Sequence, residues 1–325
     1  MLQYTGHPLV DVGAATAAAF AQKPSPGAVT ISDLEALAAY LEEQYQRKYL
    51  TGYLTCVFPN SAYVNPTAGP EKKRAFLDAH LYAFREPAAV GAETCGICGR
   101  LAGARAFRQH VPMLTGEGAL NFFPNGRPGL PLCAGCMISM AALPLGALRC
   151  AGRALIIHAD DPDLTYHFAQ QHLRRNQRLL QLQEMADDKF PDAKQPRTRL
   201  IESLREWAAQ EAQRARRVGQ RMAGPTSLTA YHFSNSGQGP DLQIYHLPAS
   251  VFSFLLDAEA DPYRQPWHAI VQAGWRADKE PVEPAARRNL LYDDLFDLPA
   301  DWGRFVQAYF LRRAYRSALH GSAPR

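Results

Sequence analysis

Two short stretches, TCGICGR at residues 94–100 and LCAGCM at residues 132–137, each carry a Cys-x-x-Cys pair. Each pair is typical of half of a metal knuckle. Four thiolates from two such turns can surround one Zn²⁺ ion as a tetrahedron, which leaves no coordination position open for catalysis. The sequence therefore predicts a structural zinc site with the ligands Cys95, Cys98, Cys133 and Cys136.

A redox centre is the alternative interpretation of these pairs. A thioredoxin-like centre places one Cys-x-x-Cys at a turn from a strand to a helix within a βαβ unit, and neither pair has that context. The remaining cysteines, Cys56 and Cys150, lie alone in apolar surroundings. We expect both to be buried core thiols.

Composition is that of an ordinary globular protein of 325 residues, with 47% hydrophobic residues, 20% charged residues and a net charge of +4. No apolar run reaches the roughly 18 residues that a membrane span needs. The start of the chain, MLQYTGHPLVDVG, lacks the basic and apolar stretches of a signal peptide. We therefore expect a cytoplasmic protein that does not bind membranes.

Local patterns along the chain alternate between helical and extended signals. Asp11 precedes an alanine-rich run that predicts a thin helix able to pack closely against a sheet. Ser32 and Glu35 form a capping box that predicts a helix over 32–49. Further predictions are a strand at 52–58, a helix at 72–84, a buried strand at 154–159, two helices between 163 and 222, and short helices after 251.

The region around the cysteines is rich in glycine and proline and shows little periodicity. Such a segment buries little apolar surface, so a metal ion would help to order it. We predict an α+β fold in four parts: a mixed N-terminal domain (1–90), a zinc-ribbon insertion (91–152), basic helices with a β-hairpin that complete the main domain (153–255), and a C-terminal helical region (256–325).

Arginines recur on two helical faces between residues 163 and 222, where acidic partners are few. Such faces suit contact with phosphates, although exposed basic faces are also often only solvated. A basic helical segment beside a zinc ribbon is typical of a nucleic-acid-binding subunit. The candidate contacts are Arg174, Arg175 and Arg178 on one face, and Arg214, Arg217 and Arg221 on the other.

The stretch LTAYHFSNSGQGPDLQIYHLP at residues 228–248 predicts a hairpin with a glycine-rich tip. Glycines there would let the backbone approach a duplex closely. The side chains of Asn235, Ser236 and Gln238 offer donors and acceptors for base edges, and Asn or Gln suits bidentate contact with adenine. The alternative is a plain polar tip.

A second polar loop contains Asn60 and is followed by Lys72 and Lys73. We consider these residues as a further, weaker nucleic-acid contact. A solvated loop is the alternative.

His110 and Asn121, between the cysteine pairs, resemble the layout of zinc-supported HNH nucleases, in which a histidine activates water. Two departures argue against cutting: Gln109 stands where an acidic residue is expected, and MISMAAL after Cys136 supplies no further Asn or His. The chain also lacks GxGxxG after a strand, a phosphate loop, GxSxG and HExxH. We therefore expect no enzyme activity and no catalytic residues.

Three features together resemble a known family. The opening TGHPLVDVG at residues 5–13 is similar to the TGNPFVD-type start of the CXXC–CXXC group of CRISPR-associated large subunits. The twin Cys-x-x-Cys pairs give that group its name, and the hairpin stretch at 229–248 resembles a segment of the same group. The resemblance covers about the first 255 residues and points to type I-B Cascade, including versions tied to Tn7-like transposons.

The resemblance implies a non-catalytic subunit of an RNA-guided surveillance complex. Such a subunit recognises the protospacer-adjacent motif on double-stranded target DNA and helps to open the duplex, while base pairing with the guide RNA reads the sequence. Its implied partners are guide RNA, target DNA, the backbone and 5′-end-capping subunits of Cascade, and a helicase-nuclease or transposition adaptor. An HNH-like nuclease and a free-standing zinc-ribbon protein that binds RNA or a protein partner remain the alternatives.

Overall fold

The computed structural model describes residues 2–86, 93–116, 126–186, 192–219, 224–235, 239–275 and 286–311. The fold is α+β, as predicted, with helices and antiparallel sheets. The chain divides into two compact units. The first unit comprises residues 1–158, 162–192 and 231–243, and the second comprises 159–161, 193–230 and 244–325.

The first unit holds the cysteine pairs and most of the sheet strands, and it begins with four helices. Its elements are α1 (Pro8–Phe20), α2 (Ile31–Tyr45), α3 (Thr51–Val57), α4 (Pro70–His80), β1 (Ala104–Ala106), β2 (Leu130–Leu132), α5 (Ala134–Ala142), β3 (Leu148–Cys150), β4 (Arg153–Ala159, whose last residue belongs to the second unit) and α6 (Pro162–Ala186).

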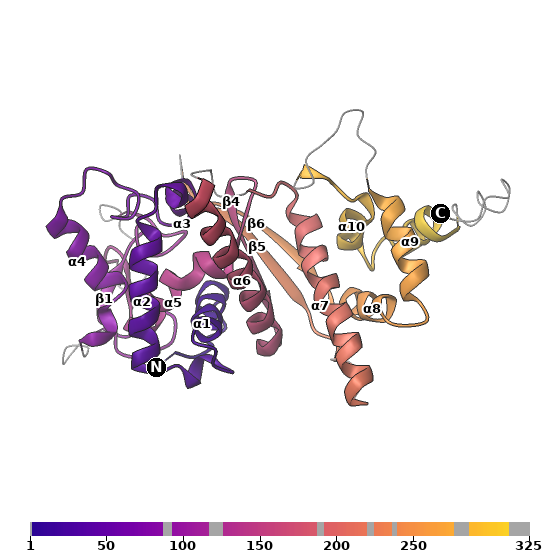
Figure 1. Cartoon of the computed structure of the whole chain (residues 1–325), viewed down its shortest axis with the longest axis horizontal. Helices are drawn as coiled ribbons and strands as arrows, with labels where there is room; N and C mark the ends of the chain where they lie inside the picture. Colours follow the sequence, from indigo (N-terminus) through magenta and orange to yellow (C-terminus); the bar gives the residue numbers. More distant parts are fainter. Residues whose placement is uncertain are drawn as a thin grey trace. The chain divides into compact units, whose positions relative to one another are not determined.

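Helix α1 is the centre of this unit, buried from Val10 to Ala19. It packs on α5 and α6, which Figure 1 shows on either side of it. The contact with α5 is so close that a Cβ atom at Gly13 would overlap the carbonyl oxygen of Ser139. The expected thin alanine helix is therefore present, and it packs closely against the helices α5 and α6.

The loop before α1 is folded back by Asp11. His7 is the N-cap residue, so the prediction that Asp11 caps this helix is wrong. Asp11 lies in the first turn instead, where its carboxylate accepts hydrogen bonds from the backbone amides of Thr5 (2.7 Å) and Gly6 (2.9 Å). The hydroxyl of Thr5 also donates to Asp11, at 2.9 Å, and Nε2 of His158 lies 3.3 Å from its Oδ2 atom.

Two local predictions need correction in the next segment. The capping box of α2 is formed by Thr30 and Asp33 and not by Ser32 and Glu35. Residues 51–57 form the helix α3 rather than the predicted strand. A short apolar run fits either structure, and here the helix buries Tyr53, Leu54, Cys56 and Val57 together.

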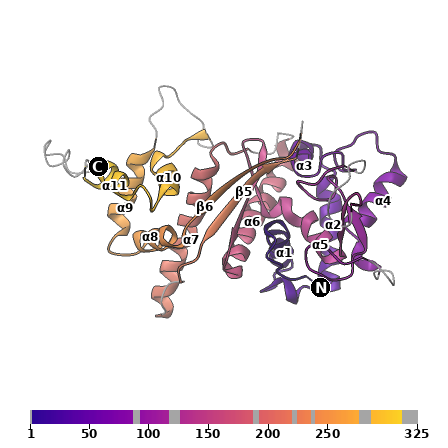
Figure 2. The ribbon, with the colours of Figure 1, turned by 180° about the vertical axis from the view of Figure 1, so that it is seen from behind.

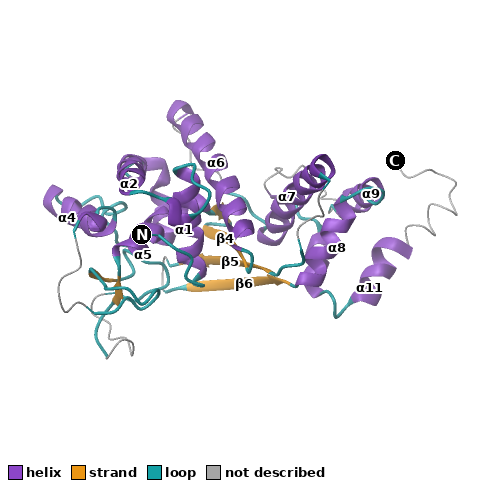
Figure 3. Ribbon diagram, turned by 90° about the horizontal axis from the view of Figure 1, so that it is seen from below, coloured by secondary structure: helices purple, strands orange, loops and turns teal. Residues whose placement is uncertain are grey.

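Strands β3, β4, β5 (Leu228–Ser234) and β6 (Asp241–Leu247) form a sheet in that order. The predicted hairpin is confirmed as β5 and β6, seen side by side in Figure 2. In the first unit, α1 and α6 lie on the same side of β4 (Figure 3). The outer strand β6 is exposed along most of its length.

The second unit is mainly helical. Its longest helix packs on the next one, where Arg205 forms an ion pair with the buried Glu259. No helix in the described ranges is long and apolar enough to cross a membrane. The helices are α7 (Pro196–Val218), α8 (Ala249–Glu259), α9 (Arg264–Gly274), α10 (Leu290–Asp294) and α11 (Trp302–Val306).

Candidate metal centre and nucleic-acid interface

The predicted metal ligands converge in the first unit. The Sγ atoms of the four cysteines lie within 4.8 Å of one another. Cys95 and Cys136 are 3.9 Å apart, and Cys98 and Cys133 are 3.4 Å apart, measured between their Sγ atoms. Four sulfurs bound to one zinc ion at 2.3 Å would be separated by about 3.8 Å. The cluster therefore has the donors and the spacing to hold a metal ion.

The two cysteine pairs sit on different kinds of backbone. The first forms a knuckle, in which the amide of Cys95 donates to the carbonyl of Arg100 (2.7 Å) and Gly99 adopts φ of 75°. The second begins a helix, because Cys133 is the N-cap of α5 and Cys136 lies in its first turn. The two pairs, each expected as half of one metal site, come together from these two different settings.

The surroundings suit a cluster of thiolates. Cys95, Cys133 and Cys136 are buried and Cys98 is partly exposed. Nε of Arg100 donates to Sγ of Cys98 at 3.3 Å, which places a positive charge beside the sulfurs. Such charge-assisted contacts outside the ligand set stabilise and orient metal ligands.

The cysteine cluster is joined to the core of the first unit. Three of the thiols belong to one apolar cluster with Val10 of α1, Val111 and Met140 of α5. Strands β1 and β2 pair in antiparallel register, with Ala104 opposite Leu132, immediately before the second cysteine pair. The segment predicted as an insertion thus supplies a central helix as well as the cysteine loops.

A polar pocket of about 500 Å³ opens elsewhere in the first unit. Its polar wall is formed by Thr55, Asn60, Asn65 and Arg108. Asn60 is exposed and adopts φ of 63°, a left-handed conformation that asparagine tolerates well. The Oδ1 atom of Asn65 accepts hydrogen bonds from the amide (3.0 Å) and hydroxyl (2.8 Å) of Thr67, which fixes the loop.

Arg108 connects this pocket to the hairpin. Its guanidinium donates to the backbone carbonyl of Asn235 at 2.9 Å. The amide of Asn235 in turn donates to the carbonyl of Cys56 at 2.7 Å, next to Thr55 in the pocket wall. The Asn60 loop and the end of β5 are separate candidate sites in the sequence analysis. In the structure they meet at this pocket. No motif marks Arg108, so the sequence alone did not reveal it.

The side chain of Asn235 does not face solvent. It is 1% exposed, and neither its Oδ1 nor its Nδ2 atom has a hydrogen-bond partner among the residues that the structure describes. The prediction that this side chain reads a base is therefore wrong for the folded chain, because a base edge cannot reach it. Ser236 and Gln238, the other predicted readers, lie outside the described residues.

The predicted cationic residues differ in exposure and pairing from helix to helix. Arg174, Arg175 and Arg178 are exposed on α6, and Lys72 and Lys73 are exposed on α4.

On α7 the arrangement is different. The Nε and Nη2 atoms of Arg214 each donate to the carboxylate of Glu211 at 2.7 Å, so this arginine is already paired. Arg217 is exposed, and Arg221 lies outside the described residues.

His110 is packed among aromatic side chains. Its ring stacks on Phe76 with centroids 5.1 Å apart and planes 12° apart, and it meets the edge of His80 at 5.7 Å. The backbone amide of Phe107 donates to its Nδ1 atom at 3.3 Å. These contacts hold the loop after β1 against α4. Asn121, its proposed companion in a nuclease, lies outside the described residues.

Comparison of the chain with protein-family models, with curated proteins and with solved structures finds no match. The fold and the cysteine site therefore define only a structural class. The chain is an α+β protein with a four-cysteine cluster that can hold a metal ion. Function has to be argued from the residues themselves.

Proposed function

We propose that this chain is the non-catalytic, DNA-recognising large subunit of a type I-B CRISPR surveillance complex. The observation that carries the proposal is the meeting of the Asn60 loop with the hairpin at the pocket lined by Arg108. The sequence suggests both segments as nucleic-acid contacts on separate grounds. The resemblance of the opening, the cysteine pairs and the hairpin to the CXXC–CXXC large subunits supports the same reading.

Within this proposal, the pocket takes part of a DNA strand next to the protospacer-adjacent motif. Arginine is suited to this position because its planar guanidinium can bind a phosphate or a guanine edge with two hydrogen bonds. Asn60 supplies an exposed amide on the same wall. Asn235 contributes through its backbone, whose carbonyl holds Arg108 in place.

The exposed cations on α4 and α6 would contact the backbone of the nucleic acid. Such contacts add affinity and fix the register but carry no sequence information. Arg174 and Arg178 are the best candidates, since they are exposed and form no ion pair with the described part of the chain.

We propose further that the metal is Zn²⁺ and that its role is structural. Four thiolate donors in a buried cluster favour zinc over the oxygen-seeking ions magnesium and calcium. The second cysteine pair directly follows β2, which pairs with β1, and Arg108 lies two residues beyond the end of β1. Zinc would therefore help to position Arg108 at the pocket.

The test is target binding by the assembled complex. Complexes carrying Arg108→Gln or Asn60→Ala are titrated with a labelled duplex that contains the target and its motif. We expect Arg108→Gln to weaken binding about tenfold or more, since hydrogen bonds from charged groups are worth roughly 1.5–3 kcal/mol. Arg47→Gln is the control, because Arg47 is partly exposed and already paired with Glu43. Wild-type affinity in both pocket variants would reject this site.

The alternatives predict different outcomes from the same preparations. A free-standing nucleic-acid-binding protein would purify without guide RNA or repeated backbone subunits. An HNH-like nuclease would cut duplex DNA with Mg²⁺ or Mn²⁺, and His110→Ala would abolish the cutting. Duplex that stays intact with either ion is the outcome that the proposal requires.

A further inference from the structure

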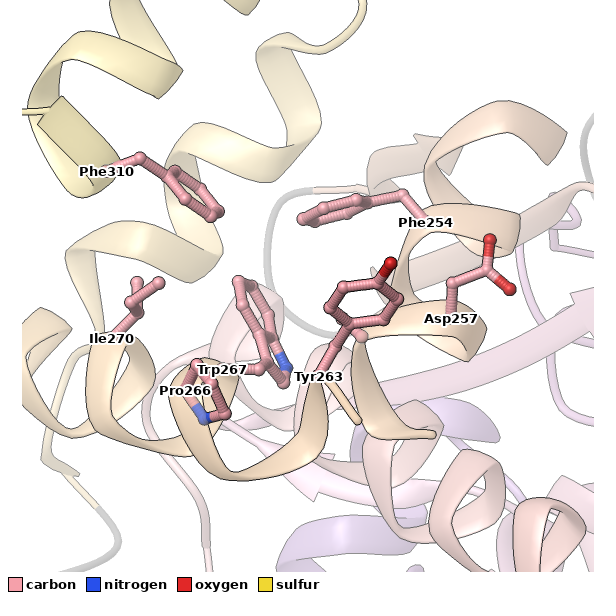
Figure 4. A pocket seen from close by; sticks show the side chains of 8 residues that line it. Phe254, Asp257, Tyr263, Pro266, Trp267, Ile270 and Phe310 are labelled. Carbon is pink, nitrogen blue, oxygen red and sulfur yellow. The ribbon is translucent and has the colours of Figure 1, made fainter. Parts of the chain in front are cut away.

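The pocket of the second unit is lined by aromatic rings, among them Phe254, Trp267 and Phe310 (Figure 4). Rings of this kind offer neither a nucleophile nor a metal donor. Among the described residues, side chains with that chemistry are concentrated in the cysteine cluster of the first unit. These thiols are therefore the strongest candidates for covalent modification.

The four clustered cysteines differ in exposure. The three buried ones, Cys95, Cys133 and Cys136, are at most 6% exposed. Cys98 is partly exposed, in the loop of the first pair. Oxidation of cysteine follows exposure and thiolate character. An oxidant in the solvent therefore meets Cys98 before the other three ligands.

The surroundings of Cys98 suit a reactive thiolate. Nε of Arg100 donates to its Sγ atom at 3.3 Å. Reactive cysteines typically lie in partly exposed, electropositive surroundings of this kind. A metal ion adds to the effect, because a cysteine that ligates a metal is deprotonated. In the metal-bound chain, Cys98 thus combines solvent access with a negatively charged sulfur.

Cys133 lies beside Cys98 and can form a disulfide with it. Their Sγ atoms are 3.4 Å apart, whereas those of Cys95 and Cys136 are 3.9 Å apart. A disulfide needs about 2.05 Å between its sulfurs. Cys133 is fixed as the N-cap of the buried helix α5, so the loop of Cys98 would make the approach. The pair of Cys98 and Cys133 is therefore the better placed for a disulfide.

We propose that Cys98 is a site of reversible oxidation by hydrogen peroxide, which joins it to Cys133 and releases the metal. The Cys98 thiolate attacks one peroxide oxygen, the O–O bond breaks, hydroxide departs, and Cys98 becomes a sulfenic acid. The Cys133 thiolate then attacks Sγ of Cys98, so that an S–S bond forms, the S–O bond breaks and a second hydroxide departs. The two sulfurs lose two electrons, and peroxide is reduced to two hydroxide ions.

The oxidised site retains only two thiolate ligands, Cys95 and Cys136, which is half of the donor set of a structural zinc site. The metal would therefore be lost from the chain. Reduction of the disulfide by a dithiol supplies two electrons and restores all four ligands. This inference rests on the structural metal proposed above, and it does not depend on DNA recognition.

The experiment uses the purified full chain, whose zinc content is measured first. Hydrogen peroxide is added in graded amounts, and released zinc is followed with a coloured chelator. Free thiols are then alkylated and disulfides are located by mass spectrometry, with dimedone in a parallel sample to trap sulfenic acid. We expect release of about one zinc ion per chain, dimedone on Cys98, and a disulfide between Cys98 and Cys133 that dithiothreitol reverses.

Two variants locate the reactive thiol. Cys98→His keeps a donor for zinc, because three cysteines and one histidine are a common structural donor set, but it removes the exposed thiolate. We expect its zinc to be released about tenfold more slowly than that of wild type. Cys56→Ser is the matched control, since Cys56 is a buried cysteine outside the cluster. It should release zinc at the wild-type rate.

The outcomes separate this inference from the proposed metal. Zinc that stays bound under peroxide, equal release from Cys98→His and wild type, or a first modification at Cys95 or Cys136 would overturn the inference and leave the structural metal in place. An untreated chain without zinc would reject both. If Cys98→His holds no zinc, the residues mapped in the oxidised wild-type chain decide the question.

Discussion

Arg108 donates a hydrogen bond of 2.9 Å to the backbone carbonyl of Asn235, 127 residues further along the chain. This bond joins the loop after β1 to the end of β5, beside a pocket that the Asn60 loop also lines. The candidate DNA site is therefore centred on an arginine and a fixed backbone rather than on the hairpin amide that the sequence suggested.

The exposed arginines of α6 should set part of the salt dependence of DNA binding. Each phosphate contact contributes about 0.9 to the slope of log affinity against log salt concentration. We expect Arg174→Gln with Arg178→Gln to lower that slope by about two units in the assembled complex, as measured by titrations at several salt concentrations. Arg214→Gln should have little effect, because Arg214 is paired with Glu211. If Arg214→Gln lowered the slope as much as the two changes on α6, the ion pair with Glu211 would not keep Arg214 from contacting DNA.

Asp11 should stabilise the fold in a pH-dependent way. Burial disfavours its charged form, but hydrogen bonds from His158 and Thr5 outweigh burial and lower the pKa of Asp11. A carboxyl whose pKa falls on folding adds stability above its unfolded pKa, near 3.8, and that stability is lost as the pH falls further.

Asp11→Asn should therefore reduce the free energy of unfolding by about 2 kcal/mol at pH 7, since several hydrogen bonds to a charged group are weakened. The difference from wild type should shrink below pH 4 in denaturant titrations. Glu71→Gln, at an exposed first-turn acid of α4, should show no such effect. A deficit in Asp11→Asn that stays constant with pH would contradict the ionised state assigned to Asp11.

The close approach of α1 and α5 requires glycine at position 13. A Cβ atom there would overlap the backbone carbonyl of Ser139, and forced overpacking costs about 1–3 kcal/mol or more. Gly13→Ala should lower the midpoint of thermal unfolding by several degrees. Gly69→Ala, where a Cβ atom has open space, should leave it nearly unchanged. Equal midpoints for the two variants would mean that the helices are not this close.

Loss of one cysteine ligand should release the metal and destabilise the first unit. Structural zinc contributes on the order of 10 kcal/mol of apparent binding free energy in small domains. We expect about one equivalent of zinc in wild-type protein by elemental analysis, and little in Cys95→Ser or Cys136→Ser. Cys56→Ser should retain zinc, because Cys56 lies outside the cluster and donates to the carbonyl of Gly152 at 2.8 Å. Normal folding of Cys95→Ser without metal would contradict the structural role.

The sequence correctly predicted the features that depend on the spacing of cysteines and on the pattern of apolar residues. The metal ligands followed from two fixed Cys-x-x-Cys spacings, and β4 and the hairpin followed from apolar runs bounded by turn residues. The two long helices after residue 162 were also predicted, because Pro191 and Pro196 interrupt a stretch with a helical pattern.

The predictions that failed concern features that depend on contacts between distant parts of the chain. Residues 51–57 are helical because tertiary packing decides the structure of a short apolar run. Asn235 is buried because its backbone pairs with Cys56 and Arg108, neither of which is near it in sequence. Arg108 itself carries no local signal, and only the fold brings it to the Asn60 loop.

Purification of the tagged chain from its native cells tests the central claim most directly. The co-purifying RNA is sequenced, and the proteins are identified and counted. The account predicts a guide RNA with constant ends and a variable segment, together with several copies of one backbone subunit. Recovery of the chain without RNA, or with RNA of unrelated sequences and no repeated subunit, would contradict its assignment to an RNA-guided complex.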